Sequence, residues 1–479
     1  MEVVLLGETS KEYIEKQAKI IASAGKLSRF DGDVLKIYEN LTGNFEENIK
    51  FIKRVIKMGH DSITDHDYVV FALKDVSILV EQIIIEQRFS SFTIKSRREV
   101  DFSNVGYYVP DFHNQENQIV EMNQELQTIY KKHMNMLFSE YHNLTEQGIK
   151  VEDARYILPY SFHSNIIMGL DAHSLKDLII SLTKGKNSNI TELRELGEKL
   201  YDIMKDRASY IQDAIDQSKQ KNKDAVEEFL NQIMFDRYQW LQDEHLDTTL
   251  LLSSTKKIDE TIFISAIMKT FGYSYEKSFE LYQTYLNGNE KSRKELKSKL
   301  MKLILKEQEA LKNINFSFQI PISLANLTHL TRHRTVELLI PDFVPIKDLK
   351  RYKAPKSIIN SGYHLEKIFE QNQELYNMFK NIGVRDEDLV YFYLSGNMLN
   401  VVANMDGKTL SHILRLRCCN KAQWEIRNIA NEMRSLVTDE SKYFSNILGP
   451  TCETEGICYE GKESCGKIKK LICKSNNEN

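Results

Sequence analysis

Two histidines, two hydroxyl groups and two carboxylates gather in one short segment, Gly59-His60-Asp61-Ser62-Ile63-Thr64-Asp65-His66. Such residues commonly cap helices and form turns, because Asp, Ser and Thr side chains accept hydrogen bonds from nearby backbone N–H groups. The same side chains can also bind a polar ligand. The segment alone leaves both interpretations open.

Three further segments are rich in arginine, whose planar fork of donors suits phosphate groups. They comprise Arg88, Ser91, Ser96 and Arg98; then Arg332-His333-Arg334; then Leu414 to Arg427 with Arg417 and Trp424. Each has a structural alternative. Basic loops are commonly solvated, a charged triplet often marks where a helix leaves the core, and a tryptophan often anchors packing.

Helices must position most of these residues. Apolar residues recur at three- and four-residue spacing over 114–147 and 190–216, which predicts two long amphipathic helices. Strand-like segments are fewer, at Tyr68–Leu73, Gly106–Val109 and Phe316–Ile320, and each lies close to a basic motif. This mixture predicts a helix-rich α+β fold.

The length and charge of the chain limit its organisation and its partners. The 479 residues suffice for two or three domains, and the polar stretch 217–226 is a candidate linker that could equally be an exposed helix surface. We predict domains over 1–220 and 225–448, followed by a cysteine-containing tail over 449–479. The net charge of −4 gives no support to a general nucleic-acid binder, so we expect no nucleic-acid partner.

The six cysteines all follow residue 417, and the last four are spaced Cys452-x5-Cys458-x6-Cys465-x7-Cys473. This spacing fits no standard zinc module, which favours closely spaced cysteine pairs, so we predict reduced thiols and no metal. No apolar run approaches the ~20 residues of a membrane span. The N-terminus lacks the pattern of a signal peptide. We therefore expect a cytoplasmic protein without a membrane partner.

The order of these motifs resembles that of the flavin-dependent thymidylate synthase family. That family has Gly-His-x-Ser/Thr-x-x-Glu-His, then Arg-His-Arg-x-x-Ser-x-Asn-x-x-Ser-x-Arg, and finally Leu-Arg followed by Ala-Gln-Trp-Glu-Ile-Arg. The first half of the chain matches the first motif at 59–66 and the back of the second at Ser96 and Arg98. The second half matches the front of the second motif at 332–334 and the last motif at 414–427.

Each half lacks what the other retains. In the first half, Glu86 and Gln87 replace the Arg-His of the signature, and the last motif is absent. In the second half, the first motif and the back of the signature are missing. The resemblance therefore implies two tandem copies of the family's α+β domain that share a composite site. Thr93 and Ile94 depart from the signature, which favours loss of activity or a changed substrate.

The resemblance implies FAD-dependent methylation of dUMP to dTMP, with methylenetetrahydrofolate as the carbon donor and NADPH as the reductant. The residues expected to bind FAD are His60, Ser62, Asp65, Arg332, His333 and Arg334. The residues expected to bind dUMP are Ser96, Arg98, Arg155 and Arg417. Arg417 is also the expected catalytic residue, because a guanidinium could stabilise negative charge that develops on the uracil ring.

The family forms homotetramers, so the resemblance also implies a homodimer of this two-domain chain. Two other functions stay open at this point. One is a flavin- or nucleotide-binding protein of the same fold without methyl transfer, and the other is a structural helical scaffold.

Overall fold

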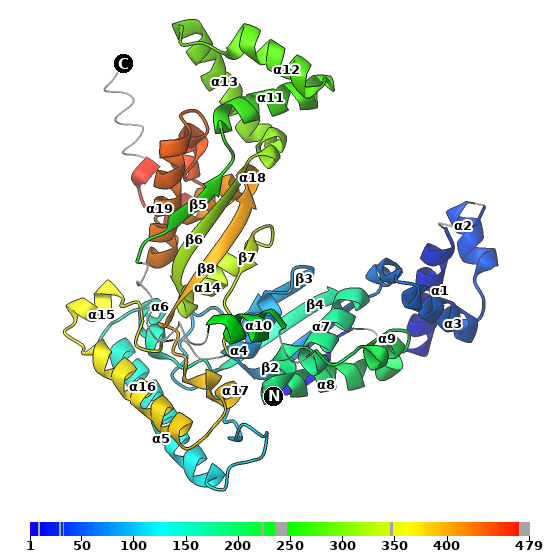
Figure 1. Cartoon of the computed structure of the whole chain (residues 1–479), viewed down its shortest axis with the longest axis vertical. Coiled ribbons are helices and arrows are strands. Elements are labelled where there is room, and N and C mark those ends of the chain that lie inside the picture. The colour runs from blue at the N-terminus through cyan, green and yellow to red at the C-terminus, as the bar shows by residue number, and fades with distance from the viewer. Residues whose placement is uncertain are drawn as a thin grey trace. The chain divides into compact units, whose positions relative to one another are not determined.

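The computed structural model describes residues 1–7, 10–27, 30–31, 33–221, 225–234, 247–344 and 348–468. The chain forms two compact units: unit 1 comprises Met1–Asp243 and Phe343–Asn397, and unit 2 comprises Glu244–Asp342 and Met398–Asn479. Each unit contains one four-stranded antiparallel sheet and several helices (Figure 1). The predicted α+β class is therefore confirmed. Part of the predicted linker, 222–224, lies outside the described residues.

Unit 1 has a sheet with the strand order β1-β2-β4-β3. The strands are β1 (Glu2–Leu5), β2 (Tyr68–Ser77), β3 (Ser90–Ile94) and β4 (His163–Asp171). The helices are α1 (Lys11–Leu27), α2 (Val34–Lys36), α3 (Phe45–Lys57), α4 (Ile78–Ile85), α5 (Asn123–Glu146), α6 (Val151–Ala154), α7 (Ala172–Lys184), α8 (Thr191–Arg207), α9 (Gln212–Gln217), α10 (Ala225–Met234), α15 (Lys356–Asn360), α16 (Leu365–Asn381) and α17 (Asp386–Leu389). Burial alternates along the first part of β2, as expected for a strand with one face on the core.

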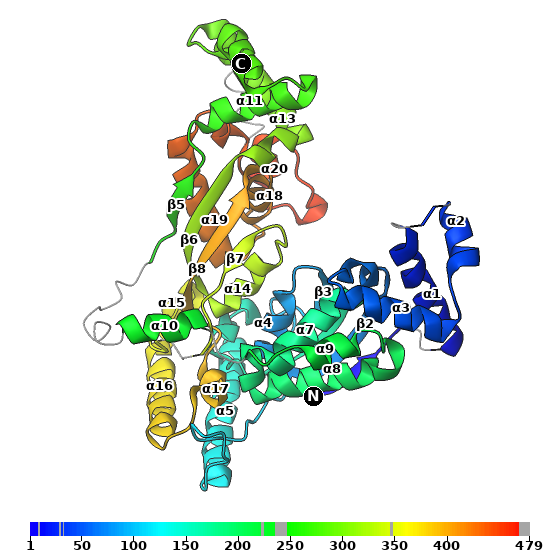
Figure 2. The same cartoon turned by 45° about the vertical axis from the view of Figure 1, so that its right-hand side comes forward.

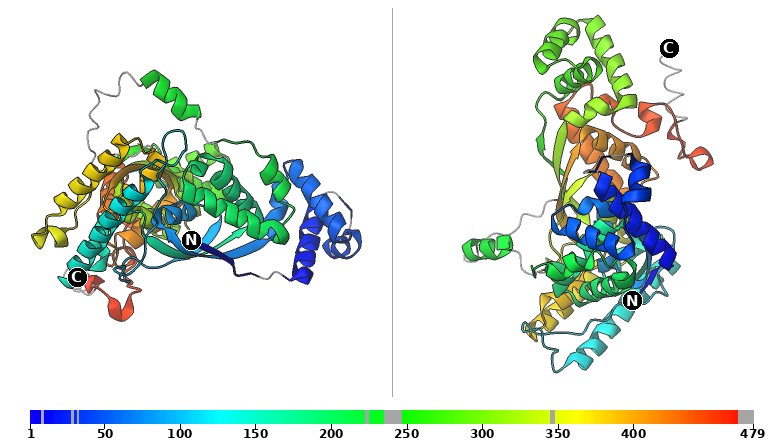
Figure 3. Two further views of the ribbon diagram at one scale, coloured as in Figure 1. Left: turned by 90° about the horizontal axis from the view of Figure 1, so that it is seen from below. Right: turned by 90° about the vertical axis from the view of Figure 1, so that its right-hand side faces the viewer.

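Unit 2 repeats this topology with the strand order β5-β6-β8-β7. The strands are β5 (Leu250–Ser254), β6 (Asn315–Ser323), β7 (Glu337–Leu339) and β8 (Met398–Asp406). The helices are α11 (Ile258–Phe271), α12 (Tyr275–Leu281), α13 (Lys291–Glu307), α14 (Leu324–Thr331), α18 (Gly407–Arg417), α19 (Trp424–Glu440) and α20 (Thr451–Thr454). Each unit also has a group of helices at one end of its sheet, α1–α3 in unit 1 and α11–α13 in unit 2 (Figure 3).

A buried serine–glutamate contact recurs at matched places in the two units. Ser77 ends β2 and Ser323 ends β6, and each precedes a helix. The N–H of Ser77 donates to Glu192 Oε1 at 2.8 Å, and the N–H of Ser323 donates to Glu425 Oε1 at 2.8 Å. Glu192 and Glu425 are the second residues of α8 and α19. Thr191-Glu192-Leu193-Arg194 thus occupies the place of the last family motif, which sequence comparison found absent from the first half.

The two halves of the sequence also meet inside unit 1. Pro159 and Leu394 form an antiparallel bridge. Pro159 lies four residues before the first residue of β4, and Leu394 lies four residues before the first residue of β8. The N–H of Tyr160 donates to Tyr393 O at 2.7 Å, and the N–H of Ser395 donates to Leu158 O at 2.8 Å. Equivalent residues therefore pair with each other, as they do in a two-fold symmetric dimer interface. Helices α5 and α16 lie side by side next to this bridge (Figure 2).

Several predicted element boundaries were wrong. The helix predicted over 114–147 begins only at Asn123, because residues 114–117 form a turn in which Asn117 has a φ of +63°. The helix predicted over 190–216 is broken between α8 and α9. Gly106–Val109 forms no strand and has only an isolated bridge between Tyr107 and Phe162. Among the described helices, none is long and apolar enough to cross a membrane.

Candidate functional site

The segment from Gly59 to His66 takes its path from the end of helix α3. Gly59 has a φ of +80°, a left-handed conformation that glycine adopts without strain, and its N–H donates to Ile56 O at 2.8 Å. The chain then forms a 3₁₀ helix over Asp61–His66, in which Thr64 Oγ1 donates to Asp61 O at 2.8 Å. Turn and capping interactions therefore do shape this segment.

The same segment forms one wall of an open pocket with a volume of about 760 Å³. His60, Ser62 and His66 line it together with residues of α1 and α3. The lining also includes the Phe51 ring and Arg54, whose guanidinium lies 5.5 Å from the centroid of that ring. Aromatic walls combined with a few polar donors are typical of pockets for planar cofactors and ligands.

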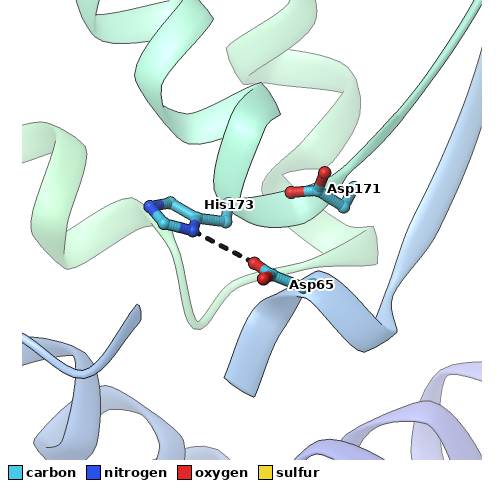
Figure 4. Close-up of side chains that lie close together, drawn as sticks. All are labelled: Asp65, Asp171 and His173. Carbon is cyan, nitrogen blue, oxygen red and sulfur yellow. Dashed lines mark hydrogen bonds and ion pairs between the residues drawn. The ribbon is translucent and has the colours of Figure 1, made fainter. Parts of the chain in front are cut away.

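Asp65 faces helix α7 and is not among the residues that line this pocket. Its Oδ1 lies 3.0 Å from Nδ1 of His173, and Asp171 lies beside them at the start of α7 (Figure 4). The ligand atoms of these three residues lie within 4.8 Å of one another. Asp171 is already the N-cap of α7, because its carboxylate accepts from the N–H and the hydroxyl of Ser174. Capping and an ion pair therefore account for this cluster.

A second pair fixes the same 3₁₀ helix on α7. Lys176, which is buried, donates to the carboxylate of Asp61. Together with the Asp65–His173 contact, this pair holds one side of the Asp61–His66 segment, and His60 and Ser62 lie at the pocket instead. Asp65 thus contacts α7 rather than the pocket.

The three residues predicted to bind dUMP in the first half lie together in unit 1. Arg98 donates from Nε to Glu152 Oε2 at 2.8 Å, and Arg155 donates from Nε to the backbone oxygen of Glu152 at 3.1 Å. Ser96 Oγ accepts from the N–H of Arg98 at 3.3 Å. Arg155 is buried and Arg98 is partly exposed. Two arginines and a hydroxyl around one short segment form a region that suits a phosphate.

Arg97, which lies beside these residues in sequence, has a different role. Its Nη2 donates to Glu81 Oε1 at 2.6 Å, and both side chains are buried. The other oxygen of Glu81 accepts from the Ser164 hydroxyl. The pair joins the segment after β3 to α4 and β4, so Arg97 is a structural residue.

The Arg332-His333-Arg334 triplet follows α14 in unit 2, and its middle residue contacts Arg417. Arg417 is the last residue of α18 and donates from Nε to His333 Nε2 at 3.0 Å and from Nη2 to His329 O at 3.1 Å. His333 is buried, whereas Arg332 and Arg334 are exposed. The contact between His333 and Arg417 therefore joins the two motifs of the second half, and Arg332 and Arg334 flank His333 in sequence with exposed side chains.

His333 is uncharged in this contact. Burial lowers the pKa of His333 to about 3, and the positive charge of Arg417 and the neighbouring His412 act in the same direction. The two imidazole rings lie 5.9 Å apart between centroids. A neutral His333 can accept the hydrogen bond from Arg417 at Nε2, which holds the guanidinium in one orientation.

The structure thus gathers the predicted residues into three groups. Unit 1 has His60 and Ser62 at a pocket, and separately Ser96, Arg98 and Arg155 around Glu152. Unit 2 has His333 of the signature triplet in contact with Arg417. Sequence comparison missed Arg54 and His66 in the pocket, Glu152, His329 and His412. Only His66 carried a signal, as the second histidine of the first motif.

These groups define a duplicated α+β protein with clustered arginines and histidines suited to anionic, planar ligands. The sequence model of the family described as thymidylate synthase complementing protein matches residues 11–209 and 250–441. The chain therefore belongs to this family, and it contains the family's domain twice.

Named relatives agree with this assignment. A flavin-dependent thymidylate synthase of Clostridium tetani is 40% identical over 85 residues, which cover 18% of this chain and 34% of that relative. One of Geobacter sulfurreducens is 31% identical over 185 residues, which cover 35% of this chain and 76% of that relative. A crystal structure of ThyX from Helicobacter pylori with FAD and dUMP covers 46% of this chain and 100% of its own, at 21% identity and a TM-score of 0.35.

Proposed function

We propose that this chain is a flavin-dependent thymidylate synthase, which methylates dUMP to dTMP with methylenetetrahydrofolate and FAD. The observation that carries the proposal is the division of arginines between the halves. The first half supplies Arg98 and Arg155 around Glu152, and the second supplies Arg417 held by His333. A protein that had lost its activity would lose such residues without regard to its other half. Membership of the family supports the same conclusion.

The residues present fit FAD as the cofactor. The pocket beside His60 and Ser62 has aromatic walls and the positive charge of Arg54. Arg332 and Arg334 are exposed cations that suit the two phosphates of a dinucleotide. We therefore propose that these residues hold FAD, with Asp65 orienting the segment that carries His60. When bound, reduced FAD supplies the hydride, and we propose NADPH as the reductant that regenerates it.

Ser96, Arg98 and Arg155 are proposed to bind the phosphate of dUMP. A phosphate would take the place that the Glu152 carboxylate has beside Arg98, because it offers more oxygens and more charge. Arg417 is proposed to contact the uracil ring. His333 and His329 fix its guanidinium before the substrate arrives, so stabilising charge on the ring requires little reorganisation.

The decisive experiment is tritium release from C5-labelled dUMP, with and without methylenetetrahydrofolate. Release that depends on FAD and on the folate, with dTMP formed, supports the proposal. Flavin and dUMP binding without release would instead identify a binding protein of the same fold. Arg98→Ala and Arg417→Ala should each reduce release about 10- to 150-fold, whereas Lys277→Ala, in an exposed pair with Glu280, should not.

We also propose that the chain forms a homodimer in the cytoplasm. The pairing of Pro159 with Leu394 within one chain joins equivalent residues of the two copies, as a two-fold contact between two subunits does. A second chain would then complete four domains. Light scattering should give twice the 55.9 kDa chain mass, and a strictly monomeric mass at assay concentration would contradict this.

A further inference from the structure

Four cysteines that are far apart in sequence line one cavity in unit 2. The cavity has a volume of about 130 Å³, and its cysteines are Cys419, Cys452, Cys458 and Cys465. Cys419 lies between α18 and α19, and the other three belong to the C-terminal tail. All four are free thiols in this structure. A set of four thiols facing one cavity is the ligand set of a metal centre rather than a usual packing arrangement.

Ion pairs hold the tail against the helices independently of any ligand. Glu453 accepts from Arg434 Nη1 at 2.7 Å and also from Lys467. Arg415, in α18, pairs with Glu455 at 3.4 Å. The cavity is therefore built by the fold itself.

Three cations, Arg415, Lys421 and Lys467, line the cavity together with the four cysteines and Glu460. Each of these cations also pairs with a glutamate. Thiolates bound to a metal centre carry negative charge, which nearby cations offset. Asn420 Nδ2 also lies 3.6 Å from Cys465 Sγ, a donor to sulfur of the kind that tunes thiolate ligands.

The sulfurs are not close enough together to be the ligands of a single tetrahedral zinc ion. Zinc binds sulfur at about 2.3 Å, so four tetrahedral ligands lie about 3.8 Å apart. Among the described residues, the ligand atoms of three or more His, Cys, Asp or Glu residues lie within 4.8 Å of one another only at Asp65, Asp171 and His173. No three of the cavity's sulfurs are that close. A cluster, in which inorganic sulfide joins several irons, holds its thiolates farther apart.

We propose that Cys419, Cys452, Cys458 and Cys465 bind an iron–sulfur cluster. Cys418 is buried and is not among the residues that line the cavity, so it is not a ligand. The cluster would join the tail to the loop that follows α18, two residues after Arg417. The cluster would hold that loop in place and would take no part in the reaction at dUMP.

The test is to purify the full chain under anaerobic conditions and to reconstitute it with ferrous iron and sulfide. We expect about 2–4 irons and an equal amount of acid-labile sulfide per chain, with a paramagnetic resonance signal in one redox state. These readouts do not depend on bound flavin or on activity. Zinc without sulfide, or the absence of both iron and sulfide after reconstitution, would overturn the proposal.

Single substitutions distinguish the cysteines that bind the cluster from a cysteine that does not. Cys452→Ser, Cys458→Ser and Cys465→Ser should each lower the iron and sulfide content several-fold, whereas Cys418→Ala should keep both. Circular dichroism checks that each variant is folded. Equal cluster content in folded Cys452→Ser and Cys418→Ala proteins would contradict the assignment of ligands.

Discussion

The two sheets have the same topology but different side chains where a ligand is proposed to bind. Glu86 and Gln87 follow helix α4 in unit 1, whereas Arg332 and His333 follow α14 in unit 2. Arg155 follows α6, whereas Val390 follows α17. Contacts that build the fold recur in both units, as Ser77–Glu192 and Ser323–Glu425 do. The comparison indicates that the contacts that build the fold are kept in both units, whereas the arginines and histidines of the family motifs differ between them.

The strongest test of this comparison concerns the residue just before the second strand of each sheet. Asp67 precedes β2, and its backbone oxygen accepts from the N–H of Ala172, the first residue of α7, at 2.8 Å. Ile314 precedes β6, and its backbone oxygen accepts from the N–H of Gly407, the first residue of α18, at 2.8 Å. Asp67 is buried and accepts from Arg207 Nη1 and Nη2 at 3.0 and 2.6 Å. Asp67→Ala should lower the free energy of unfolding by about 3–5 kcal/mol, because it leaves Arg207 buried without its carboxylate.

Chemical denaturation followed by circular dichroism measures this loss. Asp213→Ala is the control, because Asp213 forms an exposed pair with Lys53 and should cost less than ~1 kcal/mol. If Asp67→Ala lowered the free energy of unfolding no more than Asp213→Ala does, the buried Asp67–Arg207 pair would stabilise unit 1 no more than an exposed ion pair.

The second prediction compares the cations that end helices α7 and α18. Arg417 ends α18 and contacts His333, whereas Lys184 ends α7 and donates to the backbone oxygens of Asp216 and Ser218 at 3.0 and 3.2 Å. Arg417→Ala should lower kcat/KM for dUMP about 10- to 150-fold, or about 1.5–3 kcal/mol. Lys184→Ala should lower stability and leave kcat/KM of the folded protein unchanged. Equal losses of kcat/KM in the two variants would contradict the prediction that Arg417 contacts the substrate and Lys184 does not.

Sequence patterns predicted the parts of the fold that local periodicity determines. Tyr68–Leu73 and Phe316–Ile320 lie within β2 and β6 because a central strand carries a clear run of apolar residues. The break after α8 could not be predicted in this way, since apolar residues continue through it. Nor could the pairing of 343–397 with the first half, because this segment joins unit 1 through contacts distant in sequence.

The candidate site was predictable where the motifs were intact. Arg332-His333-Arg334 and Arg417 were recognised separately, and the structure brings His333 and Arg417 together. The partner of Arg98 was not predictable, because Glu152 lies 54 positions away and carries no motif of its own. The cysteine cavity was missed for the same reason: Cys419 and Cys452 are far apart in sequence, and only the folded tail brings them to one cavity.

The third prediction separates the two buried glutamates. Glu425 Oε2 accepts from the Ser323 hydroxyl and from Asn326 Nδ2, at 2.7 and 2.8 Å. Glu192 Oε2 accepts from the Tyr391 hydroxyl at 2.9 Å. A hydroxyl can accept as well as donate, but the Asn326 amide nitrogen only donates. Glu425→Gln should therefore cost about 1–3 kcal/mol more stability than Glu192→Gln.

The pKa of Glu192 supports this difference, because burial raises it and so favours the neutral form that glutamine imitates. Thermal and chemical unfolding of the two variants measure the comparison directly. Equal destabilisation would mean that the donors around Glu425 reorient, and that the two contacts are energetically the same.

The smallest expected effect is the pH dependence that His333 gives to unit 2. Folding lowers the pKa of His333 to about 3, mainly through burial. The unfolded chain therefore takes up a proton near this histidine's ordinary pKa of about 6.5, while the folded chain does not. The contribution to stability is fully present above pH ~6.5 and is lost as the pH falls from there towards 3.

His333→Gln introduces the residue that unit 1 has at the matched position, Gln87, which carries no titrating proton. Between pH 7 and 5.5, the free energy of unfolding should fall by about 1 kcal/mol less in the variant than in the wild type. Unfolding curves at both pH values measure this difference. Identical pH dependence in His333→Gln and the wild type would mean that folding does not lower the pKa of His333, so that this histidine takes up its proton over the same pH range in the folded and the unfolded chain.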